Sequence, residues 1–171
     1  GFERVFELNR NFRNEGVSVR HNPEFTMLEY YTMQADYRDS LSLTQTFLQT
    51  MAQAVSELPL AEPYACSVLT KPFLQLSMEE AFKQYAGFSL AAADIKELAA
   101  HAEQCGLGSK EQYENWAWDD LYELILVHCI EPQLPTDVPV ALVDYPAKVP
   151  CLAQEHTENL ITATGKHIEW T

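Results

Sequence analysis

The chain has 171 residues, which suits one domain with a core of useful size. Its hydrophobic content of 47% is too high for a disordered protein, and its net charge of −14 argues against a broad nucleic-acid backbone footprint, which needs clustered lysine and arginine. No apolar run is long enough to span a membrane. The four cysteines lack the spacing of zinc ligands, so we expect free thiols in a reducing cytoplasm and predict no metal site.

A β-hairpin is predicted over residues 5–37. Residues 5–12 and 25–37 alternate in polarity as strands do, and the connection between them contains Gly16 and Pro23. In the first strand the polar side is expected to face water. The alternation of the second strand places four side chains on one face: Phe25, Met27, Glu29 and Tyr31.

The rest of the chain predicts helices and one further strand, an α+β composition. Capping residues and apolar periodicity place helix starts at Asp39 or Ser40, Ser77, Asp94 and Trp116. The corresponding ends are expected near Leu58, Gly87, Gly106 and Ile130. His128 falls on the apolar face of the last helix and is interpreted as a core histidine. Residues 138–145 predict a buried strand, and residues 155–171 show no clear period.

The hairpin gathers residue types that suit a nucleotide. Arg13 offers a planar fork for phosphate, although such a residue alone is more often a surface ion-pair partner. Glu15 could accept from an amino group such as that of adenine. Arg20 and His21 lie in the loop, where they could hold a polyphosphate. Phe25 gives a stacking surface for a base.

Glu29 suggests a second ligand with a positive charge. It shares its predicted face with aromatic side chains, and Leu28 and Tyr30 make the other face partly apolar. If both faces are covered, Glu29 is buried and requires a cationic partner. No nearby lysine is an obvious candidate, and the ammonium group of a ligand would serve.

The stretch FRNEGVSVRHNPEFTMLEYY, residues 12–31, resembles motif 2 of the class II aminoacyl-tRNA synthetases. That motif reads Phe-Arg-x-Glu, a loop, and then His or Arg before Phe. The string RNEG…RHNPEFTMLEYY resembles the lysine subgroup in particular. This subgroup contains the lysyl-tRNA synthetases and a shorter elongation factor P lysyltransferase type, which lacks the anticodon-binding domain.

The resemblance implies an ATP site in which Arg13 is the catalytic residue. Arg13 would hold the α-phosphate and stabilise charge as the acyl-adenylate forms. Glu15 would read the adenine amino group, and Phe25 would stack on adenine. Arg20 and His21 would contact the outer phosphates, and the family's chemistry also uses Mg²⁺.

The resemblance also implies a lysine site. Glu29 would pair with the side-chain ammonium of lysine, and Tyr31 would support it by hydrogen bonding. Asn22 would help to order the loop and the substrate. Activated lysine would then pass to a tRNA or to an acceptor protein, elongation factor P.

The resemblance covers about residues 1–155, a partial catalytic core built as a fragment of the class II antiparallel sheet flanked by helices. Residues 119–154 look closer to the short lysyltransferase type. Residues 156–171 form a divergent tail. The family's motif 1, metal-binding acidic residues and motif 3 have no counterpart here, so we expect a truncated or frameshifted product with impaired activity.

An incomplete class II sheet would leave exposed strand edges. We expect them to be covered by a partner chain, a rearranged tail or, most simply, a second copy in a homodimer.

The alternative function is a non-catalytic remnant that uses the hairpin as a binding or interaction module. The missing metal-binding residues and the missing second ATP-binding arginine of motif 3 favour this alternative.

Overall fold

The computed structural model describes residues 1–14, 16–19, 21–59, 66–153, 156–161 and 167–170. It divides into two compact units, residues 1–46 and 47–171. In the described residues the strands form three two-stranded sheets, two antiparallel and one parallel, and helices account for most of the remaining regular structure. The α+β class predicted from the sequence is confirmed.

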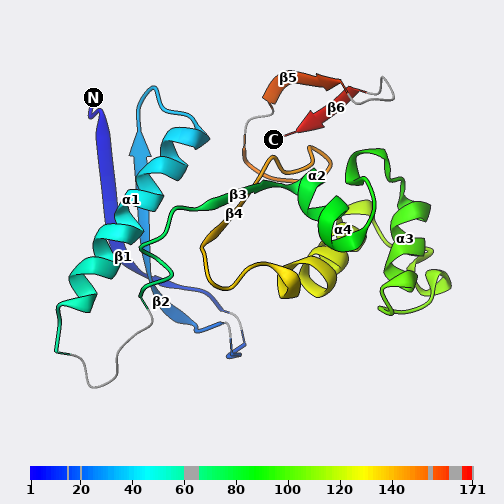
Figure 1. The fold of residues 1–171 in the computed structure, drawn as a ribbon, viewed down its shortest axis with the longest axis horizontal. Coiled ribbons are helices and arrows are strands. Elements are labelled where there is room, and N and C mark those ends of the chain that lie inside the picture. The colour runs from blue at the N-terminus through cyan, green and yellow to red at the C-terminus, as the bar shows by residue number, and fades with distance from the viewer. Residues whose placement is uncertain (15, 20, 60–65, 154–155, 162–166, 171) are drawn as a thin grey trace. The chain divides into compact units, whose positions relative to one another are not determined.

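The first unit is dominated by a long antiparallel hairpin of β1 (Arg4–Phe12) and β2 (Glu24–Thr32) (Figure 1). Alternating polar and bulky apolar residues favour this pleated, half-covered arrangement. At the loop end, the Arg13 N–H donates a hydrogen bond of 2.9 Å to the Pro23 carbonyl and extends the ladder by one step. The predicted first strand and its connection are confirmed.

The second strand is shorter than predicted. It ends at Thr32, whereas the sequence pattern suggested Tyr37. The Met33 N–H donates to the Glu3 carbonyl at 2.9 Å, and Gln34 then adopts a left-handed backbone with φ of 56°. A left-handed residue reverses the chain direction and cannot continue a pleated strand.

The first helix, α1 (Tyr37–Ser56), begins earlier than predicted, because its cap is Asp36. The Asp36 carboxylate accepts hydrogen bonds from the N–H groups of Arg38 at 2.8 Å and Asp39 at 3.1 Å. The Asp39 carboxylate in turn accepts from the Asp36 N–H at 3.0 Å. Asp39 therefore occupies the first turn, and the prediction of Asp39 or Ser40 as the cap was wrong.

The apolar stripe predicted on α1 is only partly covered. Phe47 is 43% exposed and Met51 is 46% exposed, while Ala52 is the buried residue of the helix. A helix with so little buried surface gains little from packing, which supplies most helical stability in proteins. No helix among the described residues is long and apolar enough to cross a membrane.

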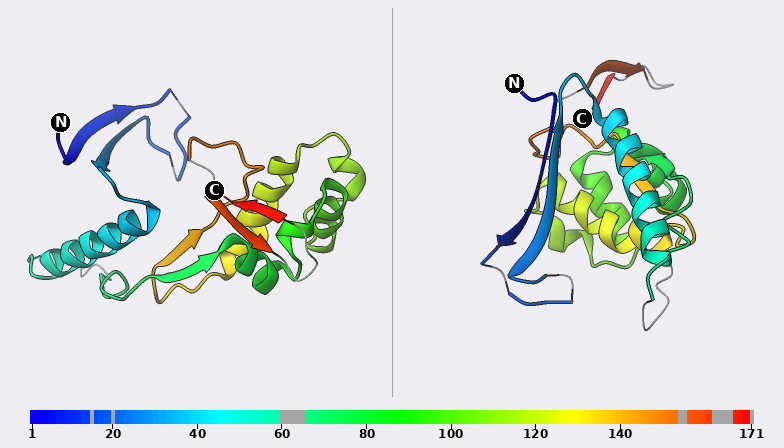
Figure 2. Two further views of the ribbon diagram at one scale, coloured as in Figure 1. Left: turned by 90° about the horizontal axis from the view of Figure 1, so that it is seen from above. Right: turned by 90° about the vertical axis from the view of Figure 1, so that its left-hand side faces the viewer.

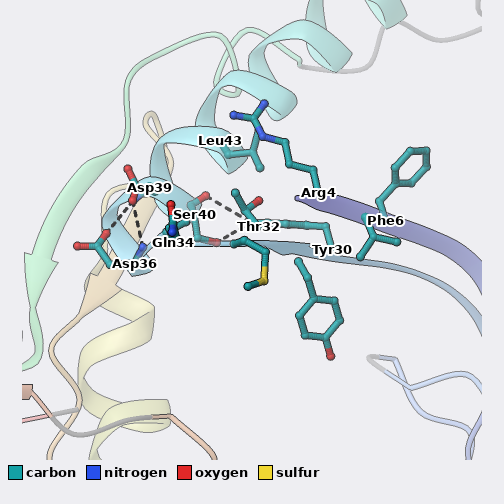
Figure 3. Close-up of a pocket in the computed structure, with 13 residues that line it drawn as sticks. Arg4, Phe6, Tyr30, Thr32, Gln34, Asp36, Asp39, Ser40 and Leu43 are labelled. Atoms are coloured by element: carbon teal, nitrogen blue, oxygen red, sulfur yellow. Dashed lines mark hydrogen bonds between the residues drawn. The ribbon is translucent and has the colours of Figure 1, made fainter. Parts of the chain in front are cut away.

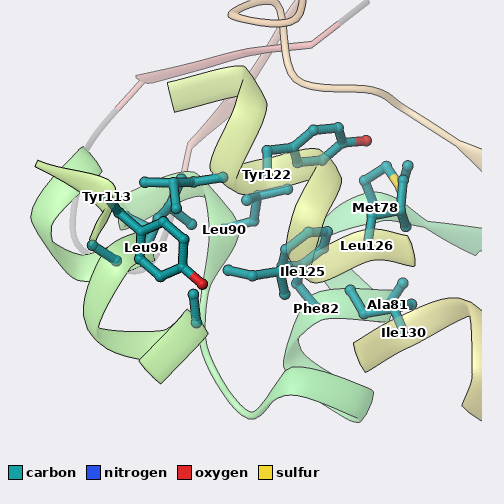
Figure 4. Packing of buried hydrophobic residues seen from close by; sticks show 14 residues of the cluster. Met78, Ala81, Phe82, Leu90, Leu98, Tyr113, Tyr122, Ile125, Leu126 and Ile130 are labelled. Carbon is teal, nitrogen blue, oxygen red and sulfur yellow. The ribbon is translucent and has the colours of Figure 1, made fainter. Parts of the chain in front are cut away.

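The second unit holds the hydrophobic core, drawn in Figure 4. Its main helices are α2 (Met78–Ala81), α3 (Ile95–Gln104) and α4 (Trp118–Ile125). α2 and α4 continue as π-helical segments, Phe82–Ala86 and Leu126–Ile130. Single 3₁₀ turns lie at Leu90–Ala92, Lys110–Tyr113 and Glu131–Gln133. Seven large side chains are fully buried: Met78, Phe82, Leu90, Leu98, Leu121, Ile125 and Ile130.

The predicted helix boundaries of this unit are largely confirmed. Ser77 and Asp94 are N-caps of capping boxes. Gly87 and Gly106, which follow the helix ends, have φ of 80° and 75°, values that favour glycine. The last helix starts at Trp118 rather than Trp116; Ala117 is its N-cap, and the Ala117 N–H donates a hydrogen bond to the Asp120 carboxylate at 3.2 Å.

His128 is exposed, so its interpretation as a core histidine was wrong. It lies in the π-helical segment that follows Ile125. A π turn holds more residues than an α turn, so the side chains beyond it rotate away from the face that a period of 3.6 predicts. Ile130, two residues later, takes the buried position instead.

Two short sheets complete the second unit. β3 (Leu74–Ser77) pairs in parallel with β4 (Val140–Val143), and the two strands run side by side in Figure 2. β4 is shorter than the predicted strand and half-buried, and Asp144 ends it with φ of 56°. β5 (His156–Ile161) pairs antiparallel with β6 (His167–Trp170), in the segment for which the sequence showed no period.

Candidate functional site

The register of the β1–β2 hairpin decides which side chains share a face. Asn11 opposes Phe25 and Glu7 opposes Glu29 in the ladder. Directly opposed residues of an antiparallel pair point to the same side, and successive residues alternate. We call the resulting surface the site face; it carries Val5, Glu7, Asn9, Asn11, Phe25, Met27, Glu29 and Tyr31.

Arg13 lies beside Phe25 at the loop end of the site face. Its guanidinium carbon is 5.4 Å from the centroid of the Phe25 ring, a cation–π contact. Arg13 is exposed and Phe25 is half-buried, and none of the ion pairs between described residues involves Arg13. The structure therefore brings together a solvent-open guanidinium fork and an aromatic surface, two groups that the sequence predicted for a nucleotide.

The loop between the strands holds the next predicted residues. His21 and Ser18 exchange backbone hydrogen bonds of 3.0 and 3.4 Å, and the Ser18 hydroxyl lies 2.9 Å from His21 Nδ1. These contacts fold the loop tip and orient the imidazole. His21 and Asn22 are both exposed. Two predicted phosphate and adenine contacts, Glu15 and Arg20, lie outside the described residues.

Glu29 lies further along β2 on the site face. It is exposed, so the condition under which we expected it to be buried is not met in the described structure. Glu7 stands directly opposite and is hydrogen-bonded by the side-chain amide of Asn9. Two carboxylates facing each other across a ladder repel, and a positively charged ligand between them would relieve that repulsion. Tyr31 is also on this face and is 73% exposed.

The predicted residues divide into two groups along the strand. A strand rises about 3.4 Å per residue, so Phe25 and Glu29 are separated by roughly 14 Å along β2. Arg13 and Phe25 form the group near the loop, and Glu29 and Tyr31 form the group further away. An extended ligand, or two ligands end to end, would be needed to contact both groups.

The sequence reasoning did not include Glu7 among the site residues. Alternation along β1 had placed it with Asn9 and Asn11 on a side expected to face water. The sequence pattern of one strand does not give the pairing register of two strands. It is this register that sets Glu7 opposite Glu29.

A cavity of about 850 Å³ lies at the other end of the hairpin, between the end of β2 and the start of α1 (Figure 3). The Tyr30 hydroxyl crosses it to hydrogen-bond the hydroxyls of Ser40 at 2.6 Å and Thr44 at 2.9 Å. Of the predicted site residues only Tyr31 lines this cavity. This cavity is therefore separate from the Arg13–Phe25 group.

The described residues contain no group of three or more His, Cys, Asp or Glu side chains placed to hold a metal ion. Mg²⁺ in nucleotide sites is usually held by one or two carboxylates together with substrate phosphates and water. No chemical step is assigned to a resident metal ion.

With this geometry in place, comparison with known sequences decides the family. The profile of the family described as tRNA synthetases class II (D, K and N) matches residues 1–169. The chain belongs to the class II tRNA synthetases. The β1–β2 hairpin, with Arg13 and Phe25 at its loop end, is the part of this family member that carries the predicted site.

Similar curated proteins are named lysine–tRNA ligases. Those of Enterobacter sp. (strain 638), Salmonella paratyphi C (strain RKS4594) and Cronobacter sakazakii (strain ATCC BAA-894) are 43%, 41% and 42% identical to the chain over 164, 171 and 163 residues. Each match covers 93% of the chain but 31% of the relative. The chain thus spans about a third of the length of the curated relatives that it matches.

Proposed function

We propose that the chain forms the motif 2 part of an ATP- and lysine-binding site in a lysine-activating class II synthetase. In the activation step, the lysine carboxylate attacks the α-phosphorus of ATP, and pyrophosphate leaves as the acyl-adenylate forms. The observation that carries the proposal is the site face: Phe25 and Glu29 share it and Arg13 lies beside Phe25 at its loop end, in a chain whose similar relatives are named lysine–tRNA ligases.

On the nucleotide side, Arg13 would contact the α-phosphate and Phe25 would stack on adenine. The cation–π contact between them supports this pairing, because it holds the guanidinium next to the ring on which the base would lie. His21 is assigned to the outer phosphates together with Arg20, and Glu15 to the adenine amino group.

On the amino-acid side, Glu29 would accept hydrogen bonds from the lysine ammonium, with Tyr31 and Asn22 in supporting roles. The support is electrostatic. Glu29 has no described cationic partner, and Glu7 opposite adds a second negative charge that favours a cation. A neutral isostere of lysine would leave both carboxylates uncompensated.

The assignment is tested by calorimetric titration of the chain with lysine and with ATP–Mg²⁺. In Glu29→Gln we expect lysine affinity to fall roughly 10- to 100-fold, because a charge-assisted hydrogen bond contributes about 1.5–3 kcal/mol. ATP affinity is expected to stay unchanged. Arg13→Ala should show the reverse pattern, with weaker ATP binding and unchanged lysine binding.

The matched control is Glu24→Gln. Glu24 is an exposed carboxylate of the same strand, but it lies on the opposite face, where it pairs with Arg10 at 3.3 Å. A surface pair of this kind contributes little to stability. Equal loss of lysine binding in Glu24→Gln and Glu29→Gln would contradict a specific role for Glu29.

For the acceptor, we propose a protein of the elongation factor P type rather than a tRNA. The net charge of −14 supports this choice, since binding of a tRNA backbone relies on clustered basic side chains. Any labelled lysine that the chain transfers should then be found on elongation factor P and not on tRNA. Transfer to tRNA alone would favour the lysyl-tRNA synthetase function.

A non-catalytic binding module is the second candidate. It is favoured by the exposure of Glu29 and by the lack of a metal-binding cluster among the described residues. ATP–pyrophosphate exchange separates the two candidates. Lysine-dependent exchange supports activation, whereas binding of both ligands without exchange supports the module.

A further inference from the structure

An open groove of about 320 Å³ lies along α4 and the π-helical segment after it, in the second unit. We call it the α4 groove. Its lining residues recur at spacings of three and four, which places them on one side of the helix. They are Trp116, Asp120, Glu123, Leu124, Val127 and His128. Another side of α4, with Tyr122 and Ile125, is buried in the core (Figure 4).

Trp116 is held in place within the α4 groove. Its ring meets the Tyr113 ring edge to face with centroids 5.0 Å apart, and its N–H donates to the Tyr113 carbonyl at 3.1 Å. Tyr113 is buried, and its hydroxyl donates to the Leu107 carbonyl at 2.6 Å. Trp116 is nevertheless 39% exposed. An aromatic side chain that is already ordered loses little conformational entropy when a partner binds to it.

Asp120 and Glu123 give the α4 groove a negative charge. Both are exposed, and neither takes part in the ion pairs found between described residues. The Asp120 carboxylate is positioned by the hydrogen bond that it accepts from the Ala117 N–H at 3.2 Å. Residues 111–128 include five acidic residues and no lysine or arginine. The group that complements this surface is therefore a cation.

Trp118 shows how this chain places a cation on an indole ring. The Lys148 ammonium lies 4.9 Å from the centroid of the Trp118 ring. In the part of the chain that the structure describes, no lysine or arginine lies over Trp116 in the same way. The exposed ring of Trp116 shares the α4 groove with two carboxylates, so a cation from outside the chain would meet both kinds of group.

We propose that the α4 groove binds a basic segment of a partner protein, with an arginine of that segment over Trp116 and hydrogen-bonded to Asp120. Arginine suits both contacts, because its planar guanidinium stacks on aromatic rings and donates two parallel hydrogen bonds to a carboxylate. Glu123 pairs with a second basic residue of the segment. The half-buried Leu124 and Val127 contact the aliphatic stems of these side chains.

The α4 groove shares no residue with the site face of the hairpin. Binding of the basic segment is therefore a separate property from the proposed binding of ATP and lysine, and each can fail without the other.

Nuclear magnetic resonance of the ¹⁵N-labelled full chain tests the proposal with the peptide acetyl-Gly-Arg-Gly-Arg-Gly-amide. We expect this peptide to shift the indole N–H signal of Trp116 and the amide signals of α4, and the corresponding glutamate peptide to shift neither. The lysine peptide should bind at least about twofold more weakly, because an ammonium cannot make the paired hydrogen bonds of a guanidinium.

Three outcomes of this titration would overturn the proposal. One is the absence of shifts at Trp116 and α4 up to about 10 mM arginine peptide, including shifts confined to β1 and β2. Another is equal binding of the lysine and arginine peptides. The third is a shift of the groove signals with the concentration of the chain alone, which would identify a second copy as the occupant.

Two neighbouring aspartates supply matched variants. Asp120→Asn removes a carboxylate of the α4 groove, whereas Asp119→Asn makes the same charge change in the same helix outside the groove. We expect arginine-peptide binding to weaken about two- to fivefold in Asp120→Asn and in Trp116→Leu, and to change little in Asp119→Asn. Equal weakening in the two aspartate variants would mean that the peptide responds to net charge alone, which would overturn the proposal.

The fold of each variant is checked by circular dichroism. Asparagine at position 120 retains an acceptor oxygen for the Ala117 N–H, so the helix cap is kept. Glu123→Gln adds a variant at an exposed side chain for which no hydrogen bond to another described residue is found. It should also weaken peptide binding about two- to fivefold, and unchanged binding in Glu123→Gln and Asp120→Asn together would overturn the proposal.

Discussion

Phe82 shows how the core of the second unit depends on single side chains. It is fully buried, stacks on Tyr122 with ring centroids 5.5 Å apart, and meets the edge of Phe88 at 5.5 Å. Phe82→Ala removes these contacts and leaves a cavity, so we expect a loss of about 3–5 kcal/mol in the free energy of unfolding. Urea denaturation followed by circular dichroism measures this loss.

Phe47→Ala is the matched control, because Phe47 is 43% exposed in α1. Because less apolar area is buried at Phe47, we expect a loss of under about 1 kcal/mol in the free energy of unfolding. Similar losses in the two variants would mean that the core is not where the structure places it.

Glu79 makes stability depend on pH. Burial alone would raise the pKa of Glu79, but hydrogen bonds from Ser89 at 2.6 Å and Ala91 at 2.9 Å, with the Lys83 ammonium at 2.9 Å, lower it below its ordinary value of 4.5. A carboxyl whose folded pKa lies below its unfolded pKa stabilises the fold above the unfolded value. That stability is lost as the pH falls through the folded pKa.

Glu79→Gln should therefore destabilise the chain at pH 7, and this loss should shrink progressively as the pH falls below the ordinary value of 4.5 and through the lower folded pKa. Urea midpoints measured across this pH range give the difference. Glu114→Gln, at an exposed glutamate, is the matched control. A Glu79→Gln loss that is the same at pH 3 and pH 7 would rule out the carboxylate as its source.

At the scale of the element, α3 depends on its N-terminal cap. The Asp94 carboxylate accepts from the N–H groups of Lys96 and Glu97, both at 2.9 Å, and the Glu97 carboxylate accepts from the Asp94 N–H at 2.7 Å. Asp94→Ala leaves these donors without a side-chain acceptor, so we expect a loss of about 1 kcal/mol. Asp94→Asn should retain most of the stability in the same urea experiment, and an equal loss in both would point away from capping.

The elements that sequence predicted well are those whose signal is local. Ser77 and Asp94 cap helices because the partner of each cap is only three residues away. Asp36 and Asp39 have the same three-residue spacing, but the predicted second strand was extended to Tyr37 and so covered the cap position. His128 was misplaced because the π turn before it follows from packing around the core rather than from a period visible in the sequence.

The candidate site follows the same rule. Period-2 alternation was enough to place Phe25, Glu29 and Tyr31 on one face, because the pleat is a property of the strand itself. The sequence could not give the exposure of Glu29, which depends on what covers the sheet. The opposition of Glu7 and Glu29 also required the pairing of two strands.

At the scale of the whole molecule, burial is distributed unequally between the two units. All buried residues among those described lie at or beyond Ala52, in the second unit. The hairpin instead exposes large apolar side chains, including Phe6 at 75% and Phe12 at 72%. In the described structure, β1 and β2 each pair only with one another. A two-stranded ribbon with little buried surface is marginally stable by itself.

Hydrogen exchange should reveal this difference. At low protein concentration we expect the amides of β1 and β2 to exchange through local opening and to show little protection. The amides of α3 and α4 should exchange only through unfolding of the second unit and should be strongly protected. Mass spectrometry of peptic peptides measures both. Equal protection in the hairpin and the helices would show that the hairpin is stabilised by contacts other than those described.

The homodimer expected from the sequence stays a prediction, and the same experiment tests it at higher concentration. A second copy that covers the exposed strands would shield their unpaired N–H groups and apolar side chains. Protection of β1 and β2 should then rise with protein concentration, because association stabilises the bound form by mass action. Protection of α3 and α4 supplies the internal reference. Hairpin exchange that is independent of concentration, with a sedimentation coefficient that is likewise constant, would contradict self-association through this surface.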